Sequence, residues 1–331
     1  MESIQSHSSS SYLTKDAASA YCRNLNYGET IAPVNDKQCA SKKHFSAKRL
    51  FCFLRFMLYM LTALVYANSA AYAQKSCSAF KSAYPACGTM NRSFKTGEVL
   101  NYKLFYHWHF VWMQTGSASV STTLRNFYGI PCYYISATGR SAPKYDWFYK
   151  IRDTLASYMD TLDLTPIRFY RSTHEASVHV RNDNVFNNNK HIAYYLNEGR
   201  EFHRDSVSIP SGTMDILTSV YFTRCINFGC IGTKDSVLLH IYLDGKVYDV
   251  CLRFLGKEVI NSGFGKFRCE KLSVNLIPGT IFREGAKMTV WATDDANHIP
   301  LQVEAPIIIG SVRAELESFS DLRNAIDAKV K

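Results

Sequence analysis

Two closely spaced histidines are the residues with the most direct potential for chemistry. His107 and His109 are two positions apart in a run that alternates apolar and polar residues, as β-strands do. In one strand both imidazoles would point to the same face, where they could begin a zinc or copper site with a third ligand from a neighbouring strand. The candidates for that third ligand are His174, His179 and Asp153. A pair of surface histidines explains the same spacing and is the interpretation we favour.

Acidic residues and signature motifs give little support to an enzyme. Asp294 and Asp295 could form an acid–base pair or a calcium loop, but a solvated turn between strands explains them as well and is favoured. The sequence contains no G-x-S-x-G, P-loop or H-E-x-x-H motif. We therefore predict no cofactor, and a metal-dependent enzyme using His107 and His109 is kept only as an alternative.

Large aromatic side chains are the clearer functional indication. They alternate along one stretch and recur later, and the candidates for lining a shared cavity are Tyr102, Tyr106, Trp108, Phe110, Trp147 and Trp291. Such rings could surround an acyl chain or another apolar ligand. A core filled by the protein's own side chains is the alternative, because 20 Phe and 21 Tyr make aromatic residues plentiful throughout the chain.

A long strand is needed to position these side chains. Every second residue from Leu100 to Trp112 is large and apolar, which predicts one half-buried strand over residues 98–113. Gln114–Gly116 is then expected to turn the chain back into a second strand over residues 117–125.

About a dozen strand-like segments are joined by connections of hairpin length. The Asn-rich clusters at 182–184 and 187–189 are expected to be turns, since Asn is typical of turns and rare inside strands. One segment has helical spacing instead. Residues 211–215 can cap a helix that ends near Arg224.

The chain divides into a leader, one β domain and a tail. Residues 1–73 have the composition of a leader and residues 74–95 form a polar lead-in. Residues 96–319 predict a mainly β domain, built as a single curved antiparallel sheet or a partly closed barrel. One helix near 212–224 is expected to cover an opening or an edge. Residues 320–331 are expected to be an exposed tail.

The leader has the pattern of a secretory signal peptide. Basic residues precede an apolar run over 56–67, and Ala71-Tyr72-Ala73 fits cleavage after Ala73. The apolar run is too short to span a bilayer. We expect export to the periplasm and a mature protein with no stable membrane span; an uncleaved anchor with a cytoplasmic tail is the alternative.

Net charge argues against a nucleic-acid partner. Lys and Arg number 38 and Asp and Glu 28, of which 8 and 4 lie in the leader, so the mature chain carries about +6. The basic residues are scattered singly and form no stripe, which is not the pattern of a nucleic-acid binder.

Cysteine spacing and a short acceptor motif suggest covalent modifications. The close pairs that could form disulfides in an oxidising compartment are Cys77 with Cys87 and Cys225 with Cys230. The cysteines in strand-like runs are expected to be small buried thiols: Cys132, Cys251 and Cys269. Four hydroxyl residues follow an Asp and precede an apolar residue, as O-glycosylation acceptors of some bacteria do: Thr154, Thr161, Ser206 and Ser236.

Several phrases of the sequence resemble an exported bacterial family, the domain of unknown function numbered 3108. They are Thr-Gly-Glu-Val-Leu-Asn-Tyr at 96–102, Pro-Ile-Arg-Phe at 166–169, Asp-Ile-Leu-Thr-Ser-Val-Tyr at 215–221, and Val-Trp-Ala-Thr-Asp-Asp through Ile-Pro-Leu at 290–301. The resemblance covers most of residues 95–318 and implies an envelope location without any assigned reaction. The predicted architecture also looks like the curved half-barrels of periplasmic lipoprotein carriers, an analogy that does not fix function.

Two non-enzymatic functions fit these observations. The first is a periplasmic protein that binds a lipid or another apolar or envelope-derived ligand inside a curved sheet, as a carrier or assembly factor. The second is a structural or interaction protein of the cell envelope, with a filled core and an edge or helix that docks a partner protein.

Overall fold

The computed structural model describes residues 90–147, 150–175, 178–198, 202–233, 235–277, 282 and 285–330. The predicted signal peptide, its cleavage site, and Cys77 and Cys87 lie outside these residues. Within the described residues, no helix combines the length and the apolar character needed to cross a bilayer.

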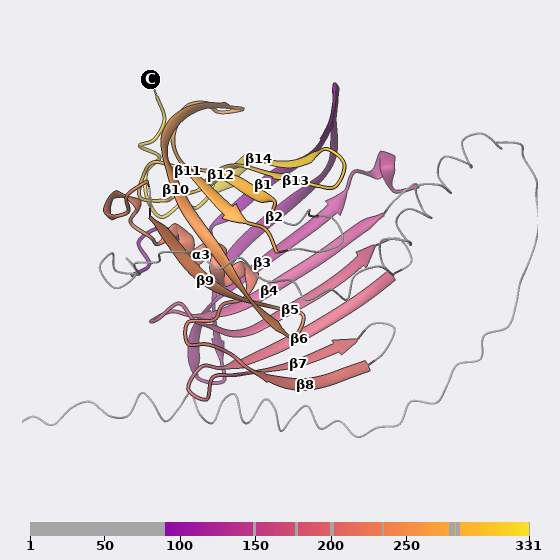
Figure 1. The fold of residues 1–331 in the computed structure, drawn as a ribbon. Helices are drawn as coiled ribbons and strands as arrows, with labels where there is room; N and C mark the ends of the chain where they lie inside the picture. The colour runs from indigo at the N-terminus through magenta and orange to yellow at the C-terminus, as the bar shows by residue number, and fades with distance from the viewer. Residues whose placement is uncertain are drawn as a thin grey trace, which may run out of the picture. The chain divides into compact units, whose positions relative to one another are not determined.

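In the described residues, fourteen strands form one antiparallel sheet (Figure 1). The strands are β1 (Val99–Trp108), β2 (Val111–Phe127), β3 (Ile130–Ser141), β4 (Ile151–Asp160), β5 (Pro166–Glu175), β6 (Val178–Asn187), β7 (Ile192–Glu198), β8 (Phe202–Ser208), β9 (Ser236–Leu243), β10 (Lys246–Ser262), β11 (Gly265–Asn275), β12 (Lys287–Thr293), β13 (Pro300–Pro306) and β14 (Ser311–Ser320). Their order is β8-β7-β6-β5-β4-β3-β2-β1-β14-β13-β12-β11-β10-β9. Neighbouring strands are consecutive in the sequence except β1 and β14, and the consecutive strands β8 and β9 form the two edges of the sheet. The predicted mainly β fold with a single antiparallel sheet is confirmed.

The aromatic stretch forms a hairpin, and the prediction of one strand over residues 98–113 is wrong. β1 ends at Trp108, which pairs with Val111, so His109 and Phe110 are a two-residue turn. His109 has a φ of +51°, in the left-handed region. The turn was hidden because large apolar residues continue to alternate through it, and because it contains no Gly, Asn or Pro.

The Asn cluster at 182–184 lies inside β6, so its prediction as a turn is also wrong. Asn182 and Asn184 are buried, and the polar groups of this segment find partners on β5. Arg171 donates from Nε to Asn182 at 2.8 Å, and Arg168 contacts Asp183 at 2.6 Å. Cross-strand partners therefore outweigh the local preference of Asn for turns.

The predicted helix is present as α3 (Ile216–Arg224), with Asp215 as its N-cap. The Asp215 carboxylate accepts a hydrogen bond from the backbone N–H of Thr218 at 2.9 Å, as a capping residue should. It also accepts from the hydroxyl of Ser157 on β4 at 2.7 Å. Burial raises the pKa of the Asp215 carboxyl above its usual value, and these hydrogen bonds offset only part of that rise. The cap therefore also fastens the helix to the sheet.

Side chains fill the interior around α3. The helix contacts the neighbouring strands β3 and β4 and also β9, which lies far from them at one edge of the strand order, so the sheet curves around the helix (Figure 1). Tyr221 and Phe222 of α3 belong to one buried apolar cluster with residues such as Phe169 and Leu239 of the sheet. The ring of Phe94 meets the ring of Tyr221 edge-on at 4.7 Å. This part of the interior is a packed core.

The segment after β14 packs on the sheet, contrary to the expected exposed tail. Ala328 is fully buried, and Lys329 forms an isolated bridge with Phe267 of β11. Leu322 and Ile326 pack against a second apolar cluster. The C-terminal residues thus add to the core that supports β1 and β14.

Candidate functional site

The residues predicted to line a cavity are dispersed. Tyr102 is buried, and its hydroxyl donates to the carbonyl of Pro300 at 3.1 Å. Trp291 is half-buried on β12 and donates its ring N–H to Glu258. Both side chains have structural partners. Tyr102 also lines a groove on the sheet, but none of the other candidates lines that groove.

The remaining aromatic candidates lie at one end of the sheet, near its surface. Trp108 is 47% exposed, Phe110 96% and Trp147 84%, so the prediction that they line a cavity is wrong. Tyr106 is half-buried, and its hydroxyl donates to the carbonyl of Ile309 in the β13–β14 turn at 3.1 Å. The side chains of Trp108, Phe110 and Trp147 thus face solvent and not a shared interior.

Two neighbouring hairpins gather the exposed apolar side chains. Tyr106 pairs with Val312 and His107 with Ser311, so the β1–β2 tip lies beside the β13–β14 turn. The exposed large apolar residues of these tips are Trp108, Phe110, Trp112, Ile308, Ile309 and Val312, which we call the apical patch. Figure 1 shows the indigo hairpin of β1 and β2 projecting beyond the neighbouring turn. Exposed apolar groups gathered in this way are typical of interaction sites.

Packing beneath the patch holds one of its tryptophans in place. The Trp112 ring stacks on Phe105 with 5.6 Å between the ring centres. The guanidinium of Arg313 lies 4.5 Å from the Trp112 ring centre, a cation–π contact. Arg313 in turn contacts Glu304 at 3.0 Å and Glu315 at 3.3 Å. Trp112 therefore has a supported position on β2.

The patch depends on close approach of its two hairpins at Gly310. This residue has a φ of +81°, and a Cβ added to it would lie 2.2 Å from the carbonyl oxygen of His107. We expect Gly310→Ala to separate the turn from β1 and to destabilise the protein by about 1–3 kcal/mol. Thermal unfolding should show a lower Tm, and hydrogen exchange should accelerate at residues 107–113.

Gly129 provides the matched control for that variant. It also has a positive φ, +89°, but a Cβ added there meets no atom within 4 Å. Gly129→Ala therefore introduces the same kind of backbone strain without the collision. An equal loss of Tm in both variants, with unchanged exchange at residues 107–113, would contradict the packing argument.

The two candidate metal ligands do not share a strand face. His109 lies in the turn, whereas His107 lies in β1 with its ring 5.0 Å from that of Trp112. His174 and His179 stack on each other across β5 and β6, with ring centres 3.8 Å apart. In the part of the chain that the structure describes, no three His, Cys, Asp or Glu residues form a group that could hold a metal ion. The predicted geometry of the metal site is therefore wrong.

The cysteine predictions are corrected at two points. Cys225 and Cys230 are free thiols, not a disulfide; Cys225 is buried beside the carbonyl of Tyr221, and Cys230 is exposed. Cys132 and Cys269 are buried free thiols as expected, whereas Cys251 is disulfide-bonded.

The proposed glycan acceptors differ in exposure. Ser206, on the edge strand β8, is exposed, whereas Thr154, Thr161 and Ser236 are half-buried. Ser206 is thus the acceptor that remains open to an enzyme after folding, and its modification stays a hypothesis.

A groove of about 530 Å³ crosses β1 to β4 and β14. Its floor includes small residues such as Ser119 and Thr138, and Arg140 and Arg152 flank it. Arg140 donates to the hydroxyl of Ser117, and Arg152 forms an ion pair with Asp146 at 2.5 Å. These arginines have partners within the protein, so the groove offers no clear binding group.

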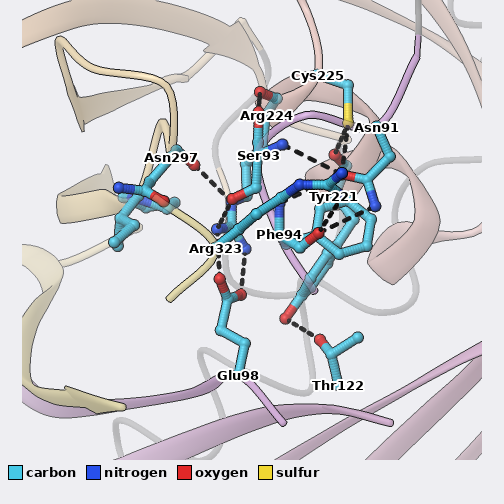
Figure 2. Close-up of polar contacts among 12 residues, drawn as sticks. Asn91, Ser93, Phe94, Glu98, Thr122, Tyr221, Arg224, Cys225, Asn297 and Arg323 are labelled. Carbon is cyan, nitrogen blue, oxygen red and sulfur yellow. Dashed lines mark hydrogen bonds and ion pairs between the residues drawn. The ribbon is translucent and has the colours of Figure 1, made fainter. Parts of the chain in front are cut away.

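A buried ion pair joins segments that are distant in the sequence (Figure 2). Arg224, the last residue of α3, is 3% exposed, and Glu98, just before β1, is 0% exposed. Nη1 of Arg224 lies 2.5 Å from Oε1 of Glu98 and Nη2 lies 2.8 Å from Oε2, which makes two parallel charge-assisted hydrogen bonds. Arg224 also donates to the carbonyl of Asn297 at 3.2 Å, and the hydroxyl of Ser93 donates to the carbonyl of Arg224 at 2.6 Å. These contacts of Arg224 therefore connect the end of α3 to two other segments, residues 93–98 before β1 and the loop that contains Asn297.

The surroundings of this ion pair indicate a stabilising role. The Arg224 guanidinium lies 5.0 Å from the ring centre of Tyr221 and 5.6 Å from that of Phe94. Thr122 donates to the Tyr221 hydroxyl at 2.8 Å, and burial raises the pKa of Tyr221 to about 12. The groups are enclosed and fully engaged, so a substrate has no access to them. The pairing of Glu98 with Arg224 cannot be predicted from the sequence, because 126 positions separate the two residues and each is distinguished only by the apolar residues beside it.

Glu270 is a buried carboxyl group with an unsatisfied oxygen. It is 2% exposed, and its Oε2 has no hydrogen-bond partner among the described residues. That oxygen lies 3.6 Å from Nε2 of His298, whose Nδ1 contacts the carbonyl of Arg224 at 2.7 Å. Burial raises the pKa of Glu270 to about 8 and lowers the pKa of His298. Glu270 is thus protonated and His298 neutral near pH 7.

Comparisons with known proteins give a family but no activity. The chain is similar to a crystal structure titled as a β-barrel-like protein of the domain of unknown function DUF1849 from Brucella abortus. The identity is 10%, the TM-score is 0.46, and the match covers 69% of this chain and 98% of that chain. No curated protein matches the chain. The model of the family described as protein of unknown function (DUF3108) matches residues 101–317, which is more than half of the chain, and the protein therefore belongs to that family.

Proposed function

We propose that this protein is an exported, non-enzymatic binding protein that docks on a component of the cell envelope through its apical patch. One observation carries the proposal: Trp108, Phe110 and Trp112 are 47%, 96% and 42% exposed on a hairpin that projects from the sheet. Complete burial of an exposed side chain of this kind contributes about 1.5–3 kcal/mol, and Trp108 and Trp112, which are already half-covered, would contribute a part of that. A contact that covers the patch would therefore be favourable without any chemistry.

The packed interior supports a binding surface on the outside of the sheet. The apolar cluster around α3 includes Tyr221 and Phe222 together with inner residues of β3 to β7, β9 and β10. A ligand in that space would have to displace well-packed side chains, and the protein would lose packing contacts that stabilise the fold. Docking through the apical patch requires no such rearrangement.

Export rests on the apolar run at 56–67 and the Ala-x-Ala site that ends at Ala73. We expect protein recovered from the periplasmic fraction to begin at Gln74, as measured by N-terminal sequencing and intact mass. Recovery of the uncut chain in the cytoplasm would overturn the export component of the proposal.

The docking component can be tested by site-specific photo-crosslinking in intact cells. A photoreactive amino acid at Phe110 should give a reproducible crosslinked product, because this side chain leads the projecting hairpin. The matched control is Leu162, which is 84% exposed in the β4–β5 turn at the opposite end of the sheet. Identical products at both positions, or none at Phe110, would count against the apical patch as the docking site.

A further inference from the structure

We infer that the occupant of the apical patch is the surface of a lipid bilayer that contains anionic lipids, an inference that rests on the proposed function. The residue types are the first argument. Trp108 and Trp112 are two of the four tryptophans of the chain and lie in the projecting hairpin, and Trp147 lies at the same end of the sheet, near the base of that hairpin. Trp147 follows the η1 turn (Pro143–Tyr145), and the backbone N–H of Ala142 before that turn donates to the carbonyl of Thr115 on β2 at 2.8 Å. Tryptophan is enriched at the boundary between lipid and water, where its ring is buried and its N–H stays hydrated.

The projection of the hairpin is the second argument. Gly116 forms the last pair between β2 and β3, with Ser141, and five residues of β2 precede it in the projecting arm. At roughly 3.3 Å per residue, the arm extends about 16 Å beyond β3. Interfacial segments insert their apolar groups about 5–10 Å into the boundary between headgroups and acyl chains. On its other side, β14 and the β13–β14 turn accompany β1 as far as His107, so the two tips would insert together while β3 and the strands beyond it remain in water.

The charges behind the tip are the third argument. Segments 103–113, 142–152 and 306–313 contain five Lys or Arg residues, of which Lys103, Arg152 and Arg313 form ion pairs with Glu317, Asp146 and Glu304. Glu304 pairs with Arg313 across β13 and β14 and so lies level with it, and the excess of positive charge behind the tip therefore comes from Lys144 and Lys150, near η1. An apolar tip with basic residues behind it is complementary to an anionic headgroup layer, because each nearby Lys or Arg contributes about 1 kcal/mol.

Vesicle binding by the purified mature protein tests this inference. Phosphatidylcholine vesicles and phosphatidylcholine–phosphatidylglycerol vesicles would be compared by co-sedimentation and by the blue shift of tryptophan fluorescence. We expect binding to the anionic vesicles that is at least tenfold tighter than to the neutral ones and that weakens in high salt. Phe110→Ser should reduce this binding at least tenfold, whereas Leu162→Ser, at the opposite end, should leave it unchanged. Urea unfolding of both variants would verify that they remain folded.

The outcomes separate this inference from the proposed function. Absence of vesicle binding, equal binding to both compositions, or no effect of Phe110→Ser would overturn lipid docking. If photo-crosslinking from Phe110 then still captures a protein partner or a second copy of the chain, docking through the patch survives with a different occupant. If both experiments fail, the proposed function falls with the inference.

Discussion

Replacing Glu98 by leucine is expected to lower the free energy of unfolding by about 3–5 kcal/mol, because it leaves the buried charge of Arg224 without its counterion. Arg224 is 3% exposed, so water cannot replace the lost carboxylate. The remaining polar partners of its guanidinium include the carbonyls of Asn297 and Ser93, which are neutral. Such a loss is a large part of the stability of an ordinary domain, about 5–15 kcal/mol. Urea unfolding followed by circular dichroism would measure it.

Removing both charges distinguishes a lost interaction from a damaged core. The double variant Glu98→Leu/Arg224→Met replaces the ion pair with apolar side chains, and we expect it to be more stable than Glu98→Leu alone. The exposed pair of Lys103 with Glu317, at 3.1 Å, supplies the control. Glu317→Leu should cost no more than about 1 kcal/mol because solvent screens that pair. A Glu98→Leu variant as stable as Glu317→Leu would remove the central role assigned to the buried pair.

The features predicted correctly from the sequence depend on local patterns. The α3 helix begins at Asp215, whose side chain satisfies a backbone N–H three residues later, so the signal and the structure lie in the same turn. The antiparallel β fold follows from alternation of side chains within single strands. Alternation does not mark where a strand reverses, and for that reason the turn at His109 and Phe110 was missed. Because the chain reverses at this turn, Trp108 and Phe110 lie at an exposed tip and do not line a cavity.

The features that the sequence did not reveal depend on contacts between distant segments. Asn182 accepts a hydrogen bond from Arg171 of β5, and Asn184 donates one to the carbonyl of Phe169 of β5. These partners stabilise both residues within β6, and residue propensities alone do not predict them. Glu98 and Arg224 each adjoin an apolar run, but nothing in the sequence states that they meet. The candidate docking residues Trp108 and Phe110 were singled out from their size and spacing. Their exposure became apparent only with the pairing of β1 with β14.

A glutamine at position 270 is expected to remove a large decrease in stability that extends from about pH 4 to about pH 8 in the wild-type protein. Glu270 has a pKa of about 8 in the folded protein, raised first by burial and then by Asp294. An unfolded glutamate titrates near 4.3. Between these two values the folded state holds a proton that the unfolded state has lost, so stability decreases as pH rises and levels off above about pH 8. At about 1.4 kcal/mol per pKa unit, the whole effect is on the order of several kcal/mol.

Comparison of the wild-type protein with Glu270→Gln from pH 7 to 9 isolates this proton. Because burial lowers the pKa of His298, that ring is neutral in the folded and the unfolded protein above pH 7. It therefore adds nothing to the change of stability with pH in this range. The buried thiols of Cys132, Cys225 and Cys269, whose pKa values burial raises, do favour unfolding at alkaline pH, but they are present in both proteins and cancel in the difference. We expect Glu270→Gln to gain stability relative to wild type as pH rises over this range, while Glu317→Gln should follow the wild type. If the difference in unfolding free energy between Glu270→Gln and the wild type stays constant from pH 7 to 9, Glu270 is already ionised in the folded protein. Its contact with His298 is then an ordinary ion pair.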